Sequence, residues 1–202
     1  MEWRILSQLF ANWYDFFMKP LEKKKFKRIR EELLAKATGS VLELGSGTGI
    51  NFPLYKEAVI VTAIEPSQHM IERSLTKHGQ AVVPIEIVQA SAEELPFATD
   101  SFDTVVATLV FCTIPNPEKA IIEMKRVCKP GGKILLFEHV KMQNRFLSSL
   151  QNCLTPAWKK ICDGCHLNRN TLELLRNKEI PIIQVHQYYR DLFVFAEAEN
   201  RK

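Results

Sequence analysis

This sequence lacks the features that mark a membrane-spanning or secreted protein. It contains no run of about 18 apolar residues, so no membrane-spanning helix is expected. The N-terminus does not combine a basic start, an apolar stretch and a small-residue cleavage site, so no secretory signal is expected. Cysteine is sparse and odd in number, with five residues scattered over 202, which is typical of free thiols in a reducing compartment. These absences predict a cytoplasmic protein.

Signals for metals and nucleic acids are also scarce. Cys162 and Cys165 form a single Cys-x-x-Cys pair, whereas a structural zinc site generally takes four ligands, often from two such pairs. His139 and His166 would bring the number of ligands to four, but no second Cys-x-x-Cys pair is present, so the sequence predicts no metal site. The basic residues are interspersed with acids and accompany no nucleic-acid reading motif, so no nucleic-acid partner is predicted.

The basic residues gather near the N-terminus, where residues 19–36 hold eight basic and three acidic side chains. Apolar residues spaced by three and four over 5–17 predict an amphipathic helix, and 21–37 predicts a second, charged one. In one interpretation these helices pack on the core with a solvated lysine face. In the other, residues 1–37 form a lid whose basic face makes peripheral contact with an anionic membrane, and whose aromatic side chains touch substrate: Trp3, Trp13, Tyr14 and Phe17.

A glycine-rich loop follows the first predicted strand. Apolar residues at 41–44 lead into Gly45, Gly47 and Gly49, and Glu43 stands two residues before the first glycine. Glycine permits positive φ and lets the backbone approach a ligand closely. Such a loop between a strand and a helix is typical of the nucleotide site of an open α/β sheet, although its G-x-G-x-G spacing differs from the dinucleotide fingerprint.

Glu65 stands at the carboxyl end of the second predicted strand, residues 59–64. A carboxylate at this place can accept hydrogen bonds from both hydroxyls of a ribose. Dinucleotide enzymes use the same device, so Glu65 indicates a ribose without identifying the cofactor that carries it.

Strand and helix patterns alternate along the rest of the chain. Continuous apolar character at 102–107 fits a parallel strand covered on both faces. A short helix is expected to begin in the glycine loop and to be interrupted by Pro53. The other predicted elements are helices at 67–77 and 117–128, a turn at 129–132, and strands at 85–88, 133–138, 181–185 and 192–196, the last two forming a hairpin.

Five segments in order narrow the choice of cofactor: 43–49, 64–67, 90–97, 100–103 and 126–132. Together they resemble the successive motifs of class I S-adenosylmethionine-dependent methyltransferases. The resemblance implies an α/β fold with a doubly wound, Rossmann-like seven-stranded sheet, the last strand antiparallel, and helices on both faces. It implies S-adenosylmethionine as the cofactor and a single methyltransferase domain over 1–202: lid helices at 1–37, a cofactor-binding core at 38–140, and a substrate-side insertion with C-terminal strands at 141–202.

The resemblance also assigns roles to residues of this chain. The glycines are expected beside the methionine and ribose parts of the cofactor, with Glu43 oriented toward the amino group directly or through water. Glu65 takes the ribose hydroxyls, and Ser91 and Ala92 contact adenine. The full set of implied cofactor contacts is Glu43, Gly45, Ser46, Gly47, Gly49, Asn51, Glu65, Pro66, Ser91, Ala92 and Thr108.

Thr108 and His139 are expected to be the catalytic residues, because both follow strands at the edge where substrates bind in open α/β folds. His139 could take a proton near neutral pH, or it could be a structural histidine bonded to a loop carbonyl. Cys112 lies at the same edge, but direct methyl transfer needs no covalent intermediate, so a packing role is predicted for it. The expected reaction is an in-line displacement in which the protein chiefly aligns the reactants.

A narrower resemblance extends over most of the chain. Residues 138–140, 156–158 and 163–165, followed by Leu167 and Arg169, look like the mammalian methyltransferase-like branch that methylates alkyl thiols. The implied acceptor is a small alkyl thiol, which needs little base catalysis because thiolates are strong nucleophiles. The alternatives are a quinone-precursor ring carbon, an amine or phospholipid head group, a hydroxyl, and, in another class, a non-catalytic protein that binds S-adenosylmethionine. The sequence does not indicate an oligomeric state.

Overall fold

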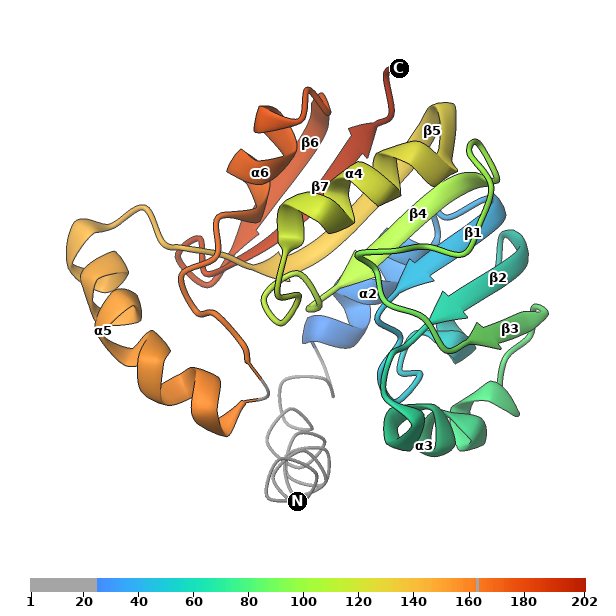
Figure 1. Cartoon of the computed structure of the whole chain (residues 1–202), viewed down its shortest axis with the longest axis horizontal. Coiled ribbons are helices and arrows are strands. Elements are labelled where there is room, and N and C mark those ends of the chain that lie inside the picture. Colours follow the sequence, from blue (N-terminus) through green and yellow to red (C-terminus); the bar gives the residue numbers. More distant parts are fainter. Residues whose placement is uncertain (1–24, 163) are drawn as a thin grey trace.

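A single sheet of seven strands forms the centre of the molecule (Figure 1). The computed structural model describes residues 25–162 and 164–202. The strands are β1 (Gly39–Leu44), β2 (Ala58–Ile64), β3 (Ile85–Val88), β4 (Phe102–Thr108), β5 (Cys128–His139), β6 (Ile182–Tyr188) and β7 (Phe193–Glu199). Their order across the sheet is β3-β2-β1-β4-β5-β7-β6.

The strand directions confirm the predicted fold class. β1 pairs in parallel with β2 on one side and with β4 on the other, and the β2–β3 and β4–β5 pairs are parallel as well. β7 lies antiparallel between β5 and β6. The chain thus moves outward from β1 to β3 and then returns to β4, so the carboxyl ends of β1 and β4 flank the switch point where ligands bind in such sheets.

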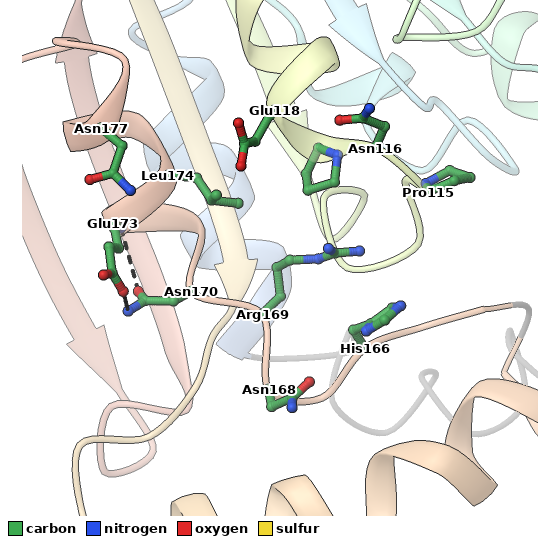
Figure 2. A pocket seen from close by; sticks show the side chains of 11 residues that line it. Pro115, Asn116, Glu118, His166, Asn168, Arg169, Asn170, Glu173, Leu174 and Asn177 are labelled. Carbon is green, nitrogen blue, oxygen red and sulfur yellow. Dashed lines mark hydrogen bonds between the residues drawn. The ribbon is translucent and has the colours of Figure 1, made fainter.

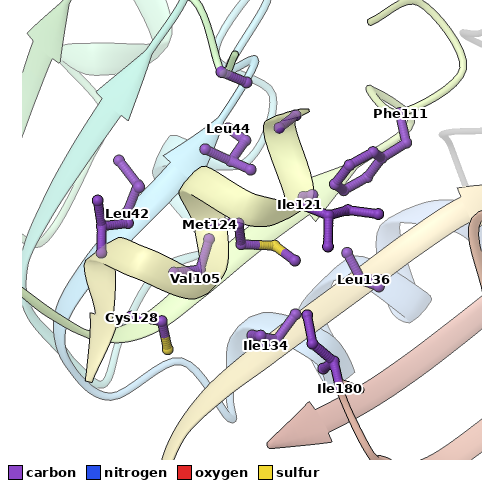
Figure 3. Packing of buried hydrophobic residues seen from close by; sticks show 14 of the residues in the cluster. Leu42, Leu44, Val105, Phe111, Ile121, Met124, Cys128, Ile134, Leu136 and Ile180 are labelled. Carbon is purple, nitrogen blue, oxygen red and sulfur yellow. The ribbon is translucent and has the colours of Figure 1, made fainter. Parts of the chain in front are cut away.

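Helices cover both faces of this sheet, as predicted. They are α2 (Lys27–Leu34), α3 (Gln68–His78), α4 (Pro117–Val127), α5 (Arg145–Ile161) and α6 (Thr171–Asn177), with a short 3-10 helix, η2 (Phe52–Leu54). Successive residues of β5 enter different cores, since Ile134 packs with Ile121 and Met124 of α4 and Leu135 packs with Leu33 of α2. Figure 3 shows the first of these cores, with α4 packed over the sheet. Burial on both faces explains why the strands are continuously apolar.

The glycine loop leads into η2, so the prediction of an α-helix beginning there is wrong. The N–H of Phe52 donates to the carbonyl of Gly49 at 3.1 Å, and that of Leu54 donates to Asn51 at 2.8 Å. These bonds span three residues, which is the 3-10 pattern. Pro53 has no N–H to contribute to an α-helical ladder, so the segment stays a tight turn.

Two other predicted boundaries differ from the structure. The helix expected over 21–37 is shorter among the described residues, where α2 ends at Leu34. The turn expected at 129–132 is part of β5, because the backbone of Asn200 bonds to Gly131 at 2.8 Å and to Gly132 at 2.9 Å. The helix predicted at 5–17 and its aromatic residues lie outside the described part of the chain.

Helix α5 exposes one apolar side. Its residues Phe146, Leu150, Leu154, Trp158 and Ile161 are between 42% and 77% exposed. They follow one another at spacings of three and four, so they share one face of the helix. Among the described residues, no helix has both the length and the apolar character needed to cross a membrane. The apolar side of α5 is therefore a surface feature that the packing of the sheet does not require.

Candidate active site

The glycines after β1 are required for different reasons. All three have positive φ, at 62° for Gly45, 55° for Gly47 and 73° for Gly49. A Cβ on Gly45 would lie 2.2 Å from the side chain of Val110, and one on Gly49 would lie 2.7 Å from the ring of Phe52, so both are packed too closely for a side chain. A Cβ on Gly47 would meet nothing within 4 Å. The open space at Gly47 is where a ligand can approach the backbone.

Glu65 joins the tip of β2 to the glycine loop. Its carboxylate accepts the N–H of Gly47 at 2.9 Å and the N–H of Ser67 at 3.0 Å. The N–H of Ser46 also bonds to the carbonyl of Ile64 at 2.9 Å, which ties the loop to the same strand. The acid expected at the ribose is thus held at the carboxyl edge of the sheet, beside the open space at Gly47.

Three of the predicted cofactor residues meet in one buried network. The amide of Asn51 donates to Glu43 at 2.7 Å and to the hydroxyl of Thr108 at 2.9 Å. Tyr55 donates to the other carboxylate oxygen of Glu43 at 3.1 Å. Burial raises the pKa of Glu43 to about 7, although hydrogen bonds from Asn51 and Tyr55 and the charge of Arg30 oppose the change. The network connects the carboxyl ends of β1 and β4, which flank the switch point.

Arg30 completes this network and was missed in the sequence. Its guanidinium donates to Asn51 at 3.0 Å and to Thr108 at 2.7 Å, and the side chain is only 2% exposed. Both interpretations of the basic segment placed its charges on an outward face, toward solvent or toward an anionic membrane. The spacing of Phe26, Ile29, Arg30 and Leu33 places Arg30 on the buried side of α2. The helical spacing of the neighbouring apolar residues could therefore have predicted that Arg30 is buried.

The residues expected near adenine lie along the ends of β2 and β3. The N–H of Glu65 donates to the carbonyl of Val88 at 3.2 Å, which brings the two strand ends together. Ser91 accepts the N–H of Glu93 at 3.2 Å, and Ala92 is buried in the loop after β3. The carbonyl of Pro66 accepts a bond from Gln89 at 3.1 Å. Pro66, Ser91 and Ala92 therefore follow neighbouring strands, next to the tip that carries Glu65.

His139 contacts a thiol at the end of β5. Its Nε2 lies 3.2 Å from the sulfur of Cys165, and its buried Nδ1 has no hydrogen-bond partner among the described residues. The alternative of a histidine bonded to a loop carbonyl is therefore wrong. Burial lowers the pKa of His139, but the hydrogen bond with Cys165 and the charges of Cys165 and Glu138 outweigh it and raise the pKa above its usual value.

Cysteines 112, 162 and 165 form a buried cluster beside His139. The hydrogen bond from Cys112, followed by that with His139, lowers the pKa of the Cys165 thiol well below its usual value, although burial opposes this. Cys112 is buried as predicted, but it also lies within 4.8 Å of the donor atoms of His139 and Cys165. No sequence spacing joins Cys112 to Cys165, so the cluster could not be seen before the fold was known.

A separate hollow of about 550 Å³ lies between the start of α4 and α6 (Figure 2). Polar and charged side chains line it, including Glu118, His166, Arg169 and Glu173. None of the predicted cofactor contacts lines this hollow, so it is distinct from the open space at Gly47. Arg169 connects the hollow to the loop that follows β4 by donating a hydrogen bond to the carbonyl of Ile114 at 2.9 Å.

Comparison with known proteins gives concordant matches. The model of a methyltransferase domain family matches residues 42–136. The human thiol S-methyltransferase TMT1B is 32% identical over 198 residues, covering 92% of this chain and 81% of that protein. A phosphatidylethanolamine N-methyltransferase of Cereibacter sphaeroides is 34% identical over 158 residues, covering 76% of this chain and 77% of its own.

Solved structures show the same fold at lower sequence identity. A SAM-dependent methyltransferase of Thermotoga maritima superposes with a TM-score of 0.70 at 20% identity, covering 97% of this chain and 98% of its own. An S-adenosylmethionine-dependent methyltransferase of Mesorhizobium loti superposes with a TM-score of 0.64 at 16% identity, covering 84% and 95% respectively.

Proposed function

Since this chain belongs to the class I S-adenosylmethionine-dependent methyltransferases, in the branch that contains the thiol S-methyltransferases, we propose that its methyl acceptor is a small alkyl thiol. The enzyme class and the cofactor follow from the family. The acceptor is supported by the relatives named for thiol methylation, which match over most of their length. A thiol acceptor also needs little base catalysis, because a thiolate is already a strong nucleophile.

The residues at the switch point fit the cofactor. The hydroxyl of Ser46 is buried without a hydrogen-bond partner among the described residues, next to the open space at Gly47. The Glu65 carboxylate lies at the tip of the neighbouring strand, where a ribose is held in open α/β sheets. When bound, S-adenosylmethionine supplies a methyl group already activated by its sulfonium and a neutral leaving group. Ser46, Gly47 and Glu65 are therefore assigned to cofactor binding.

The protein contributes alignment to the transfer. Thr108 ends β4 and is paired in register with Phe137 of β5, so Thr108 and His139 stand at the ends of adjacent strands. Arg30 and Asn51 both donate to the Thr108 hydroxyl and fix its direction. Correct orientation of two reactants can supply several kcal/mol toward lowering a barrier. Thr108 and His139 are assigned to the face where the acceptor meets the methyl group.

Membrane contact is part of the proposal. We assign it to α5, because its apolar side is exposed and because it holds Arg145, Lys159 and Lys160 and no acidic residue. Aromatic and aliphatic side chains on one face of a helix with basic residues beside them suit the interface of an anionic membrane. The basic segment at 19–36 would add to this attraction. All five cysteines are free, which supports a cytoplasmic location at such a surface.

A phospholipid amine is the second candidate acceptor. The relative named phosphatidylethanolamine N-methyltransferase favours it, and so does the exposed apolar side of α5, which could bring the enzyme to lipid. A ring carbon or a hydroxyl has no supporting observation of this kind.

The test is transfer of labelled methyl from S-adenosylmethionine to matched acceptors. We expect alkyl thiols to be methylated with kcat/KM at least about 100-fold above primary amines of the same alkyl chain, and the rate to follow the thiolate fraction across a series of thiol pKa values. Phosphatidylethanolamine vesicles serve as the lipid arm. Faster methylation of the lipid amine would replace the thiol assignment, and no product with any acceptor would favour a non-catalytic binding protein.

A further inference from the structure

Two cysteines and a histidine, side chains of the kinds that bind metals, come together from separate parts of the chain at the carboxyl ends of β4 and β5. Cys112 follows β4, His139 ends β5 and Cys165 follows α5. The two sulfurs and a ring nitrogen of His139 all lie within 4.8 Å of one another, and the distance from His139 Nε2 to Cys165 Sγ is 3.2 Å. Residues so distant in the sequence meet here only because the fold brings them together.

Backbone hydrogen bonds hold the three segments in place. The N–H groups of Val110 and Phe111 donate to the carboxylate of Glu138 at 2.9 and 3.1 Å, which fixes the loop before Cys112 beside His139. The N–H of His166 donates to the carbonyl of Cys112 at 2.9 Å, which fastens the Cys165 loop to the same place. The donor atoms are thus positioned by the protein itself, as a binding site requires.

We propose that Cys112, His139 and Cys165 bind a zinc ion. Two sulfur atoms and an imidazole are donors that favour zinc among the available divalent ions. Zinc bonds of about 2.3 Å to sulfur and about 2.0 Å to nitrogen place the ligand atoms of a tetrahedral site roughly 3.5–3.8 Å apart, and the three donor atoms already lie within 4.8 Å of one another. Zinc takes Cys112 and Cys165 as thiolates and His139 as a neutral imidazole, so any proton still held by these three groups leaves to solvent, and the two thiolates neutralise the charge of the ion.

Three protein ligands leave the fourth position of a tetrahedral zinc open. Cys162 packs in the same buried cluster, but among residues 25–162 and 164–202 the group whose donor atoms lie within 4.8 Å of each other contains only Cys112, His139 and Cys165. Catalytic zinc sites have this arrangement, whereas structural sites are closed by four protein ligands. An open position at this edge would hold an acceptor thiol as its thiolate. That role rests on the proposed function, whereas binding of the metal does not.

The experiment uses the purified full-length chain, reduced and freed of metal with a chelator. Cobalt is titrated in, because tetrahedral thiolate-bound cobalt has intense visible bands and a sulfur-to-metal charge-transfer band in the near ultraviolet. We expect one cobalt per chain and its displacement by one zinc. Cys112→Ser, His139→Asn and Cys165→Ser should each weaken zinc binding by about 100-fold or more, since losing a ligand costs more than losing an outer partner.

The matched controls are Cys162→Ser, a thiol of the same cluster, and Cys153→Ser, an exposed one. Both should retain the cobalt spectrum. A wild-type chain that shows no charge-transfer band when cobalt is added would overturn the site. A loss in Cys162→Ser as large as in Cys165→Ser would overturn the assigned ligand set. All of these readouts are independent of methyl transfer, so failure of the thiol acceptor leaves the metal result intact.

Discussion

The carboxylate of Glu65 has two functions at the tip of β2. It holds the glycine loop through the N–H of Gly47 and the start of α3 through the N–H of Ser67, and it is assigned to the ribose of the cofactor. A substitution here changes both the shape of the loop and the hydrogen bonds offered to the sugar. Effects on cofactor affinity and on folding stability must therefore be measured together.

We expect Glu65→Ala to weaken binding of S-adenosylhomocysteine by about 100-fold or more, because hydrogen bonds to a charged acceptor contribute about 1.5–3 kcal/mol each. Isothermal titration calorimetry measures the affinity, and thermal unfolding without ligand reports the cost to the loop. Glu86→Ala is the matched control, since Glu86 is an exposed acid on the adjacent strand β3. Affinity that is unchanged in Glu65→Ala would refute the ribose assignment.

Glu43 predicts a specific dependence of stability on pH. Its folded pKa is about 7, raised mainly by burial, whereas in the unfolded chain the pKa stays at its ordinary value. A raised folded pKa gives stability that is fully present below the unfolded pKa and is lost as the pH rises through the folded pKa. Wild type should therefore lose up to roughly 3 kcal/mol relative to Glu43→Gln between pH 5 and 8.

Urea unfolding of both proteins at each pH measures this difference. Glutamine keeps the size of the side chain and can bond to Asn51 and Tyr55, so the comparison isolates the charge. Glu86→Gln, at an exposed position, should track wild type at all pH values. A wild-type and Glu43→Gln difference that does not vary with pH would contradict the assigned titration.

Individual site residues could be predicted from the sequence better than the contacts between them. Glu43, Asn51 and Thr108 were assigned one at a time from the family motifs, and the structure joins them by hydrogen bonds. Arg30 was not singled out in the basic segment, because both interpretations of that segment turn its charges outward, to solvent or to a membrane. The contact of His139 with Cys165 joins the end of β5 to the loop after α5, and local patterns carry no information about it.

Among the helices and strands, α5 has an exposed apolar side that packing within the fold does not explain. Only Gln151 and Thr155 of this helix are buried, so its apolar side contributes little to the core. Gln151 secures the helix by donating to the carbonyls of Val140 at 3.1 Å and Leu167 at 2.9 Å. A helix held by polar bonds and exposing its apolar side is suited to contact an outside surface.

We expect a Leu150→Gln and Leu154→Gln double variant to bind anionic phospholipid vesicles at least about 10-fold more weakly than wild type, since burying one leucine contributes about 1.5–3 kcal/mol. Co-sedimentation with vesicles that contain phosphatidylserine measures the partition. Ser149→Gln with Asn152→Gln is the control on the opposite side of α5. Equal partition of both double variants, or no binding by wild type, would remove α5 as the membrane contact.

Elements with strong periodicity were predicted more accurately than those governed by local hydrogen bonds. The hairpin of β6 and β7 is confirmed, because alternating segments on either side of a turn leave few other pairings. The helix expected after the glycine loop is wrong, because Pro53 converts the segment to a 3-10 turn. The start of β5 depends on bonds to Asn200 from the far end of the chain, which no local window contains.

For the whole molecule, the order of strands determines where chemistry can occur. β1 and β4 lie side by side at the switch point, so the glycine loop faces the end of β4, and β5 brings His139 next to it. Two cores, one on each face, hold these strand ends in place. This topology was predicted from a family resemblance, since periodicity alone indicates parallel strands without giving their order.

The central claim is that the cofactor binds at the carboxyl ends of β1, β2 and β3, with its ribose at Glu65 and its methionine part beside the glycine loop. A crystal structure of the complex with S-adenosylhomocysteine tests it most directly. The account predicts ribose hydroxyls bonded to Glu65, the ligand backbone beside Gly47, and the sulfur facing Thr108. Ligand bound elsewhere, for instance in the hollow at Arg169, or a bound ligand whose ribose makes no hydrogen bond to Glu65, would contradict it.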